Sequence, residues 1–229
     1  MPQPAPISAG REKLVFDWLG DRFGHRMWLE EPGRRPGPLL DSVEGAPDEL
    51  WPASPPLQEF HVETRGPGQL VALLVGRAGR SHWSLSVLCD AEREALWFEA
   101  ACRIGQAPSR SGQLAGWLGS RYRAGKDLHL VADNGRPIEP PGACPAPGAT
   151  PLVDAGVATS AGRGLWLAGD GSDWTVGPES SRAWLLASAM QEAGSKSPID
   201  LSLAAEAALP DARTICWAYR FAIAEHATA

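Results

Sequence analysis

The chain has no long apolar run and no leader-like N-terminus. No segment approaches the roughly 18 consecutive apolar residues that a membrane-spanning helix needs. The opening MPQPAPISAG lacks the basic and apolar regions of a signal peptide. The first absence argues against a helical membrane protein, and the second against secretion. We therefore expect a soluble cytoplasmic protein without a membrane partner.

Cysteine is scarce as well. Cys89, Cys102, Cys144 and Cys216 form no CxxC pair and show no spacing typical of zinc ligands. We expect reduced thiols, as is usual in a cytoplasmic protein, and neither a metal ion nor another cofactor.

Positive charge is also in short supply. The chain has 21 Lys and Arg residues against 27 Asp and Glu, which gives a formal net charge of -6. General nucleic-acid binding needs a basic surface, so we expect no nucleic-acid partner. Eighteen of the 21 basic residues are arginine, a bias that we attribute to a GC-rich genome.

Glycine, proline and tryptophan, by contrast, are abundant. With 25 Gly, 21 Pro and 10 Trp, the chain is expected to have many turns and an aromatic core. Seven prolines fall within residues 31–56, which limits this connection to one short strand near residues 39–43. We expect Trp51 to anchor the connection to the body of the protein.

Residues 13–31, KLVFDWLGDRFGHRMWLEE, predict a β-hairpin that turns at Gly20 and Asp21. Glycine permits the positive φ that a two-residue turn requires. The expected cross-strand pairs are Trp18–Phe23, Phe16–His25 and Leu14–Met27. All six residues share one face, so His25 is expected to be a hydrogen-bonded core histidine rather than a ligand.

Residues 57–103 predict a meander of four antiparallel strands, around which the rest of the fold is organised. The expected cross-strand pairs are Phe60–Leu74, His61–Leu73, Leu74–Trp83, Val75–His82, Trp83–Ala100 and Ser84–Glu99. In this register one face is entirely apolar and belongs to the core. The other face is polar around an apolar centre and carries the candidate functional residues His61, His82, Ser84, Trp97, Glu99 and Arg103.

A metal site and a catalytic site are two interpretations of this polar face. His61 and His82 are expected two strands apart, about 9–10 Å sideways, which is too far for a shared ion, so no metal site is predicted. His82 and Glu99 lie diagonally opposite in the expected register and would act as acid and base. Ser84, however, lies in a regular strand without a nucleophile elbow. We expect no catalytic residues. The alternative is that the protein is a hydrolase- or isomerase-like enzyme with His82 and Glu99 as its acid and base.

Non-enzymatic binding is the interpretation that we favour. Trp97 offers a stacking surface, and the polar side chains around it offer hydrogen bonds, a mixture suited to a polar small molecule, a sugar or a protein partner. Two structural alternatives remain open. The face is either solvated and without a ligand, or it is covered by another chain and the protein is a structural subunit.

The GRAGRS segment, residues 76–81, connects the second and third strands of the meander. Arg77, Arg80 and the backbone amides between them form a possible anion-binding loop. The alternative is that two glycines simply shape a six-residue hairpin loop. The segment opens no helix and lacks the Lys-Ser/Thr of a P-loop, so a nucleotide site is not expected.

The C-terminal half mixes irregular and ordered segments. Residues 164–168 predict a short strand. The Ala-rich residues 178–193 predict a helix, with Ser180 or Ser181 as its cap and Gly194 as its stop, and a second short helix is expected over residues 200–210. In residues 212–224 large residues alternate with smaller or polar ones, which predicts a strand with its aromatic residues in the core.

The block LQEFHVE, followed by ALLVGRAGRSHWSLSV, resembles a segment of uncharacterised bacterial proteins. These proteins have no assigned activity, and the resemblance covers about the central fifth of the chain. It implies no catalytic or binding residues.

Together these patterns predict a mainly β protein. We expect an antiparallel β-sandwich built on the four-strand meander, with one or two short helices in the C-terminal half. Residues 1–10 are expected to be a disordered lead-in and residues 11–229 a single domain. The alternative is a β domain over residues 11–138, joined by the Pro-rich residues 139–151 to a small unit over residues 152–229.

Overall fold

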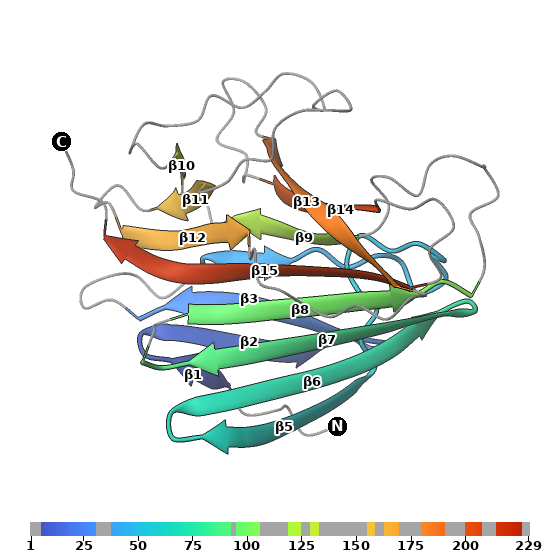
Figure 1. The fold of residues 1–229 in the computed structure, drawn as a ribbon, viewed down its shortest axis with the longest axis horizontal. Coiled ribbons are helices and arrows are strands. Elements are labelled where there is room, and N and C mark those ends of the chain that lie inside the picture. Colours follow the sequence, from blue (N-terminus) through green and yellow to red (C-terminus); the bar gives the residue numbers. More distant parts are fainter. Residues whose placement is uncertain are drawn as a thin grey trace.

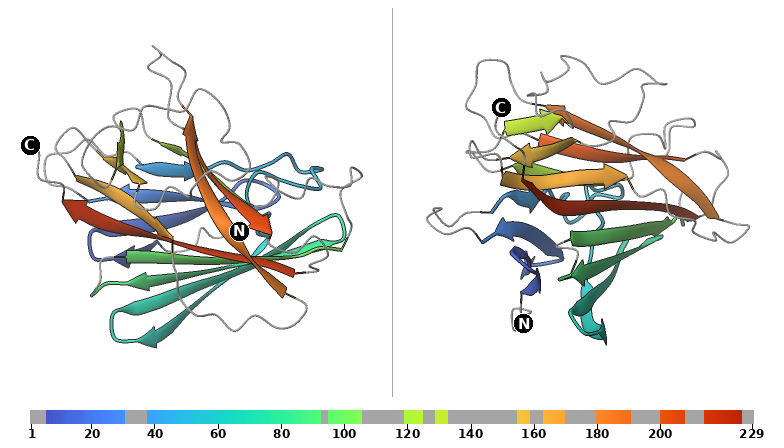
Figure 2. Two further views of the ribbon diagram at one scale, coloured as in Figure 1. Left: turned by 45° about the horizontal axis from the view of Figure 1, so that its top comes forward. Right: turned by 60° about the vertical axis from the view of Figure 1, so that its left-hand side comes forward.

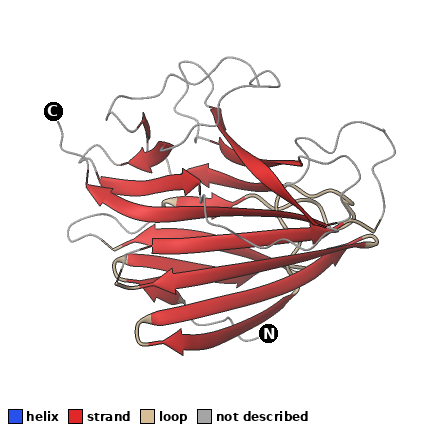
Figure 3. Cartoon of the chain, viewed as in Figure 1, coloured by secondary structure: helices blue, strands red, loops and turns tan. Residues whose placement is uncertain are grey.

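The computed structural model describes the chain in segments. These are residues 6–30, 38–92, 95–105, 119–124, 129–132, 155–158, 163–169, 180–190, 200–207 and 214–225. The described residues form fifteen strands and some of the loops that connect them, with no helix among them (Figure 3). The mainly β sandwich is therefore confirmed. It also follows that the described part of the chain contains no helix with the length and hydropathy of a membrane span.

Two sheets make up the fold. The first runs in the order β1 (Ile7–Ala9), β2 (Glu12–Trp18), β3 (Phe23–Leu29), β4 (Leu40–Ser42), β9 (Gly119–Ala124), β14 (Asp200–Ala207) and β13 (Ser180–Met190). The second contains β5 (Glu59–Gly66), β6 (Gln69–Ala78), β7 (Ser81–Asp90), β8 (Ala95–Arg103), β15 (Thr214–Glu225), β12 (Arg163–Gly169), β11 (Ala155–Ala158) and β10 (His129–Ala132).

The two sheets are joined through β13. It pairs antiparallel with β14 over its last eight residues and parallel with β15 at its first three. The other strand pairs among the described residues are antiparallel. The β5–β8 meander and β15 lie side by side, with β1–β3 in a separate layer behind them (Figures 1 and 2).

The core fills the space between these layers. Its largest fully buried side chains include Phe16 and Tyr122 from the first sheet, and Phe98, Trp217 and Tyr219 from the second. Aromatic contacts cross between the sheets: the ring of Tyr122 packs edge-on against Tyr219 with centroids 6.3 Å apart. The predicted aromatic core of the last strand is thus confirmed for the described side chains. Trp51 is also partly buried against the core, as expected.

The β2–β3 hairpin has the predicted register, with Trp18 opposite Phe23 and Phe16 opposite His25. Its two-residue turn is closed by a hydrogen bond from the Leu19 amide to the Arg22 carbonyl, 2.8 Å long. Gly20 has φ +107°, which explains the need for glycine at this position. The short strand expected near residues 39–43 is also present, as β4.

The meander keeps its predicted faces, but two of its three registers are wrong by two residues. Phe60 lies opposite Leu74 as predicted. His82, however, lies opposite Arg77 and Arg103 rather than Val75. Because side chains alternate along a strand, a shift of two residues leaves every residue on its expected face.

Close packing at Gly76 explains the shift in the β6–β7 hairpin. The loop was expected to begin at this glycine, but β6 continues to Ala78 and the turn contains only Gly79 and Arg80. A Cβ atom at Gly76 would lie 1.7 Å from the Pro56 carbonyl oxygen. The glycine is therefore needed for close approach of another backbone, not for a turn.

The side chain of Asp90 explains the shift in the β7–β8 hairpin. This side chain accepts a hydrogen bond from the Glu92 amide, 3.1 Å long, and so turns the chain on its own backbone. Pairing can therefore extend to Asp90 and Ala95. In the expected register, Ala95 lay opposite Leu88, two residues before its actual partner Asp90.

Both predicted helices are wrong. The segment expected as a helix over residues 178–193 contains β13, and the one expected over residues 200–210 contains β14. Alanine favours helices only weakly, by tenths of a kcal/mol per residue, and tertiary context overrides such preferences. Here β14 pairs with β9 and β13 pairs with β15, so the two strands satisfy backbone groups that would otherwise be open at two sheet edges.

The N-terminal segment requires one further correction, and a strand predicted in the C-terminal half is confirmed. Residues 7–9 of the expected disordered lead-in form β1, in which Ile7 and Ala9 are buried. The strand predicted over residues 164–168 is confirmed as β12. β15 pairs with β8 along nine residues, so the last strand and the meander share one sheet. The Pro-rich residues 139–151 lie outside the described residues.

Candidate anion-binding site

A row of basic side chains crosses three neighbouring strands at one end of the meander. His82 on β7 pairs with Arg77 on β6 and with Arg103 on β8. Directly paired residues project from the same face of a sheet. All three side chains are exposed, whereas their neighbours Trp83 and Cys102 are buried. The row therefore lies on the outer face, away from the core.

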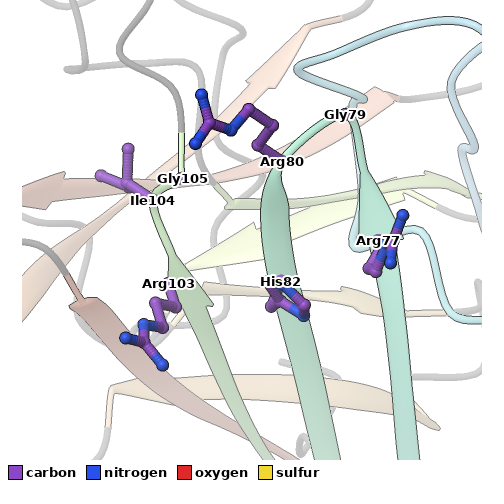
Figure 4. A pocket seen from close by; sticks show the side chains of 7 residues that line it. All are labelled: Arg77, Gly79, Arg80, His82, Arg103, Ile104 and Gly105. Carbon is purple, nitrogen blue, oxygen red and sulfur yellow. The ribbon is translucent and has the colours of Figure 1, made fainter.

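This row lines a hollow of about 620 Å³. Its lining residues are Arg77, Gly79, Arg80, His82, Arg103, Ile104 and Gly105. Figure 4 shows Arg77, His82 and Arg103 on three adjacent strands, with Arg80 at the tip of the hairpin above them. The volume falls within the range of small-molecule sites, roughly 300–1,000 Å³.

The electrostatics of the hollow are one-sided. Three arginines and one histidine line it, and no carboxylate does. Within the described ranges, no ion pair engages Arg77, Arg80 or Arg103. Guanidinium groups that lack a carboxylate partner are suited to oxyanions, which they bind through two parallel hydrogen bonds.

The backbone that carries Arg77 is held by a neighbouring side chain. The side-chain amide of Gln58 donates from Nε2 to the Arg77 carbonyl oxygen at 3.2 Å, and its Oε1 accepts from the Arg77 backbone amide at 3.1 Å. Gln58 thus extends the β5–β6 ladder up to the edge of the hollow. These two bonds hold the backbone of Arg77 in place at the edge of the hollow.

A second contact fixes the hairpin tip against the end of β8. The Gly105 amide donates to Ser81 Oγ at 3.2 Å. A Cβ at Gly105 would lie 1.9 Å from the Arg80 carbonyl oxygen, so only glycine allows this approach. Gly79 has φ +57° in the two-residue turn, a conformation that favours glycine.

The predicted functional face is thus divided in two. Of its residues, the hollow brings together His82 and Arg103, along with both arginines of the predicted anion-binding loop. Ser84 is exposed two residues further along β7 than His82, and it lies opposite Val75 on β6. Trp97 and Glu99 lie six and four residues back along β8, about 20 and 13 Å from Arg103. Neither lines the hollow.

The expected diagonal contact of His82 with Glu99 is therefore wrong. Glu99 pairs with Ser86, and Ser84 pairs with Ala101. The distance of about 13 Å along the strands separates the proposed acid from the proposed base, and proton transfer requires hydrogen-bond distance. The register shift removes the geometric basis of the catalytic alternative.

His61 and His82 are further apart than expected. His61 pairs with Leu73, four residues along β6 from the partner of His82. Together with two strand spacings this gives a separation of about 16 Å. Among the residues that the structure describes, no three His, Cys, Asp or Glu side chains are grouped so that they could hold a metal ion.

A second polar cluster, buried in the core, was only partly predicted. His25 Nε2 and the Tyr122 hydroxyl are 2.9 Å apart, and the Tyr122 and Tyr219 hydroxyls are 2.6 Å apart. This chain of hydrogen bonds joins β3 and β9 of the first sheet to β15 of the second. Burial lowers the pKa of His25 to about 3 and raises the pKa of Tyr122 well above its ordinary value. The hydrogen-bonded core histidine was predicted; its tyrosine partners come from distant segments and were not.

Glu44 extends this cluster toward the loop after β4. The His25 amide donates to Ser42 Oγ at 2.8 Å, and the Ser42 hydroxyl donates to Glu44 Oε1 at 2.6 Å. Burial raises the pKa of Glu44 to about 7, although the Ser42 hydrogen bond and the nearby charge of Arg22 act in the opposite direction. His25, Tyr122 and Tyr219 are buried, and their hydrogen bonds support the core.

Comparison with known proteins adds no further constraint on this site. No protein-family model matches the chain, and no curated protein matches it. The candidate site is therefore defined by its own geometry and charge.

Proposed function

We propose that the protein is a non-enzymatic binding module whose ligand is an anion held at the basic end of the β6–β8 face. The observation that supports this proposal is the hollow lined by three arginines and one histidine, without a lining carboxylate. The rigid backbone around Arg77 and Gly105 supports it further, because a preorganised site loses less entropy on binding. The polar small molecule that we expect as ligand is thereby narrowed to an anionic one.

A cytoplasmic location is part of the same proposal. Cys89, Cys102 and Cys216 are free thiols, a state typical of a reducing compartment. Cys144 lies outside the described residues. Burial raises the pKa of Cys89 and of Cys102 to about 12, so these two thiols are unreactive.

Thermal unfolding in the presence of sulfate or phosphate tests the proposal. A ligand that binds only the folded state raises the melting temperature. We expect millimolar anion to stabilise the wild type and to lose most of this effect in the double variant Arg77→Gln/Arg103→Gln. Arg65→Gln is the matched control, since Arg65 is an exposed arginine outside the hollow and pairs with Glu63 at 3.0 Å. Equal stabilisation of wild type and double variant would contradict the proposal.

A further inference from the structure

We infer that the ligand carries at least two anionic groups and bridges Arg77 and Arg103, as a linear polyphosphate or an equivalent small polyanion would. This inference rests on the proposed function and specifies the class of ligand for the same site. The one-sided charge of the row, its length and its fixed backbone each support it.

The length of the row sets the size of the ligand. Arg77, His82 and Arg103 occupy three consecutive strands, and adjacent strands are about 4.8 Å apart. The backbones of the two arginines are therefore about 10 Å apart, with His82 between them. A ligand with separated anionic groups can contact both guanidinium groups with less inward movement of the two side chains than a single oxyanion requires.

The charge of the row sets the valence of the ligand. Arg77 and Arg103 carry fixed positive charges, and Arg80 adds a third at the hairpin tip. One negative charge would leave most of this repulsion in place. Two or more negative charges neutralise the row, so binding is expected to rise steeply with the charge of the anion.

The surroundings of the row argue for a small molecule rather than a nucleic acid. Single-stranded nucleic acid is bound through aromatic side chains on which its bases stack, and no aromatic ring other than that of His82 lines the hollow. Trp97 is about 20 Å away along β8. The net charge of -6 also disfavours a long polyanion, because the rest of the surface would repel it.

Calorimetric titration of the full chain with orthophosphate, pyrophosphate and tripolyphosphate tests this inference. Ionic strength is held constant, because screening changes all three affinities. We expect tripolyphosphate and pyrophosphate to bind at least tenfold more tightly than orthophosphate. We expect Arg77→Gln and Arg103→Gln each to weaken tripolyphosphate binding at least fivefold and orthophosphate binding by a smaller factor, so that the preference for tripolyphosphate decreases in both variants. Arg65→Gln should bind all three anions as the wild type does.

The possible outcomes separate this inference from the proposed function. Equal affinities for the three anions, lost in the arginine variants, would support an anion site but overturn the bridging ligand. A preference for tripolyphosphate that persists unchanged in Arg77→Gln and Arg103→Gln would also overturn it, since the preference would then arise elsewhere on the surface. Failure of all three anions to bind would overturn the proposed function itself.

Discussion

Glu44 shows how a single buried side chain can make the whole fold sensitive to pH. Its Oε2 atom is buried without a hydrogen-bond partner among the described residues, and Oε1 has only the Ser42 hydroxyl. Burial therefore disfavours the charged form and raises the pKa from 4.5 to about 7. The folded state holds a proton that the unfolded chain releases between these two values.

We predict that stability conferred by Glu44 falls as the pH rises from about 4.5 to 7. Below pH 4.5 the carboxyl is protonated in both states, and above pH 7 the folded state bears the full cost of the buried charge, up to about 3 kcal/mol. Glu44→Gln cannot ionise, so the variant should be more stable than the wild type at pH 8 and close to it at pH 4.5. Urea unfolding of both proteins across this range measures the difference.

The comparison with wild type is needed because His25 acts in the opposite direction. Its pKa falls from 6.5 to about 3 on folding, so its contribution is lost as the pH drops below 6.5. The difference between the two proteins cancels this term. Glu59→Gln, at an exposed glutamate on β5, serves as the control. If the free energies of unfolding of Glu44→Gln and wild type changed in parallel with pH, the pKa of Glu44 would not be raised on folding.

At the scale of elements, the β6–β7 hairpin is positioned by a neighbouring segment rather than by its own turn. The Pro56–Leu57 backbone lies directly against Gly76, with the Leu57 Cα 3.0 Å from a Cβ placed there. The backbone amide of Gln58 then continues the contact by donating to the Val75 carbonyl at 2.8 Å. These contacts support β6 beside Gly76, where it continues to pair with β7 through Ala78 and brings Arg77 opposite His82.

We predict that Gly76→Ala destabilises the protein by about 2 kcal/mol or more, because the added methyl overlaps backbone atoms that cannot rotate away. Gly66→Ala is the control: it lies in β5, and the nearest atom to its added Cβ is Gln69 Oε1 at 3.7 Å. Chemical denaturation of both variants measures the difference. Equal effects of the two substitutions would show that the close approach at Gly76 does not constrain the hairpin.

At the scale of the whole molecule, β15 ties the C-terminus to the meander. It pairs with β8 on one side and β12 on the other. Trp217, Tyr219 and Phe221 of β15 are buried in the core, where Trp217 packs edge-on against Trp83 with ring centroids 6.2 Å apart. Without β15, β8 would become an exposed edge and the core would lose three large aromatic residues.

We predict that a fragment of residues 11–138 does not fold on its own. The fragment contains the whole meander but lacks β15 and exposes the edge of β8, which favours aggregation. Circular dichroism and urea unfolding of the fragment measure this, with the full chain as the reference. Cooperative unfolding of the isolated fragment would instead support the two-domain alternative.

Residue patterns within one segment carried the correct predictions. Alternation in residues 57–103 identified the apolar and polar faces, and the Gly20–Asp21 turn defined the register of the β2–β3 hairpin. The sequence also indicates the basic residues of the candidate site, Arg77, Arg80, His82 and Arg103, which the structure brings to one hollow. These features depend on side-chain alternation and turn chemistry, which are local properties of the chain.

Only the tertiary structure decided what depends on contacts between distant segments. The row of Arg77, His82 and Arg103 requires registers that arise from Pro56 packing on Gly76 and from the Asp90 turn. The pairing of β13 and β14 overrides the helical preference of their Ala-rich sequences. The hydrogen bonds of His25 likewise reach Tyr122, 97 residues away along the chain. Alternation sets which face a residue occupies, but long-range packing sets which residues on that face become neighbours.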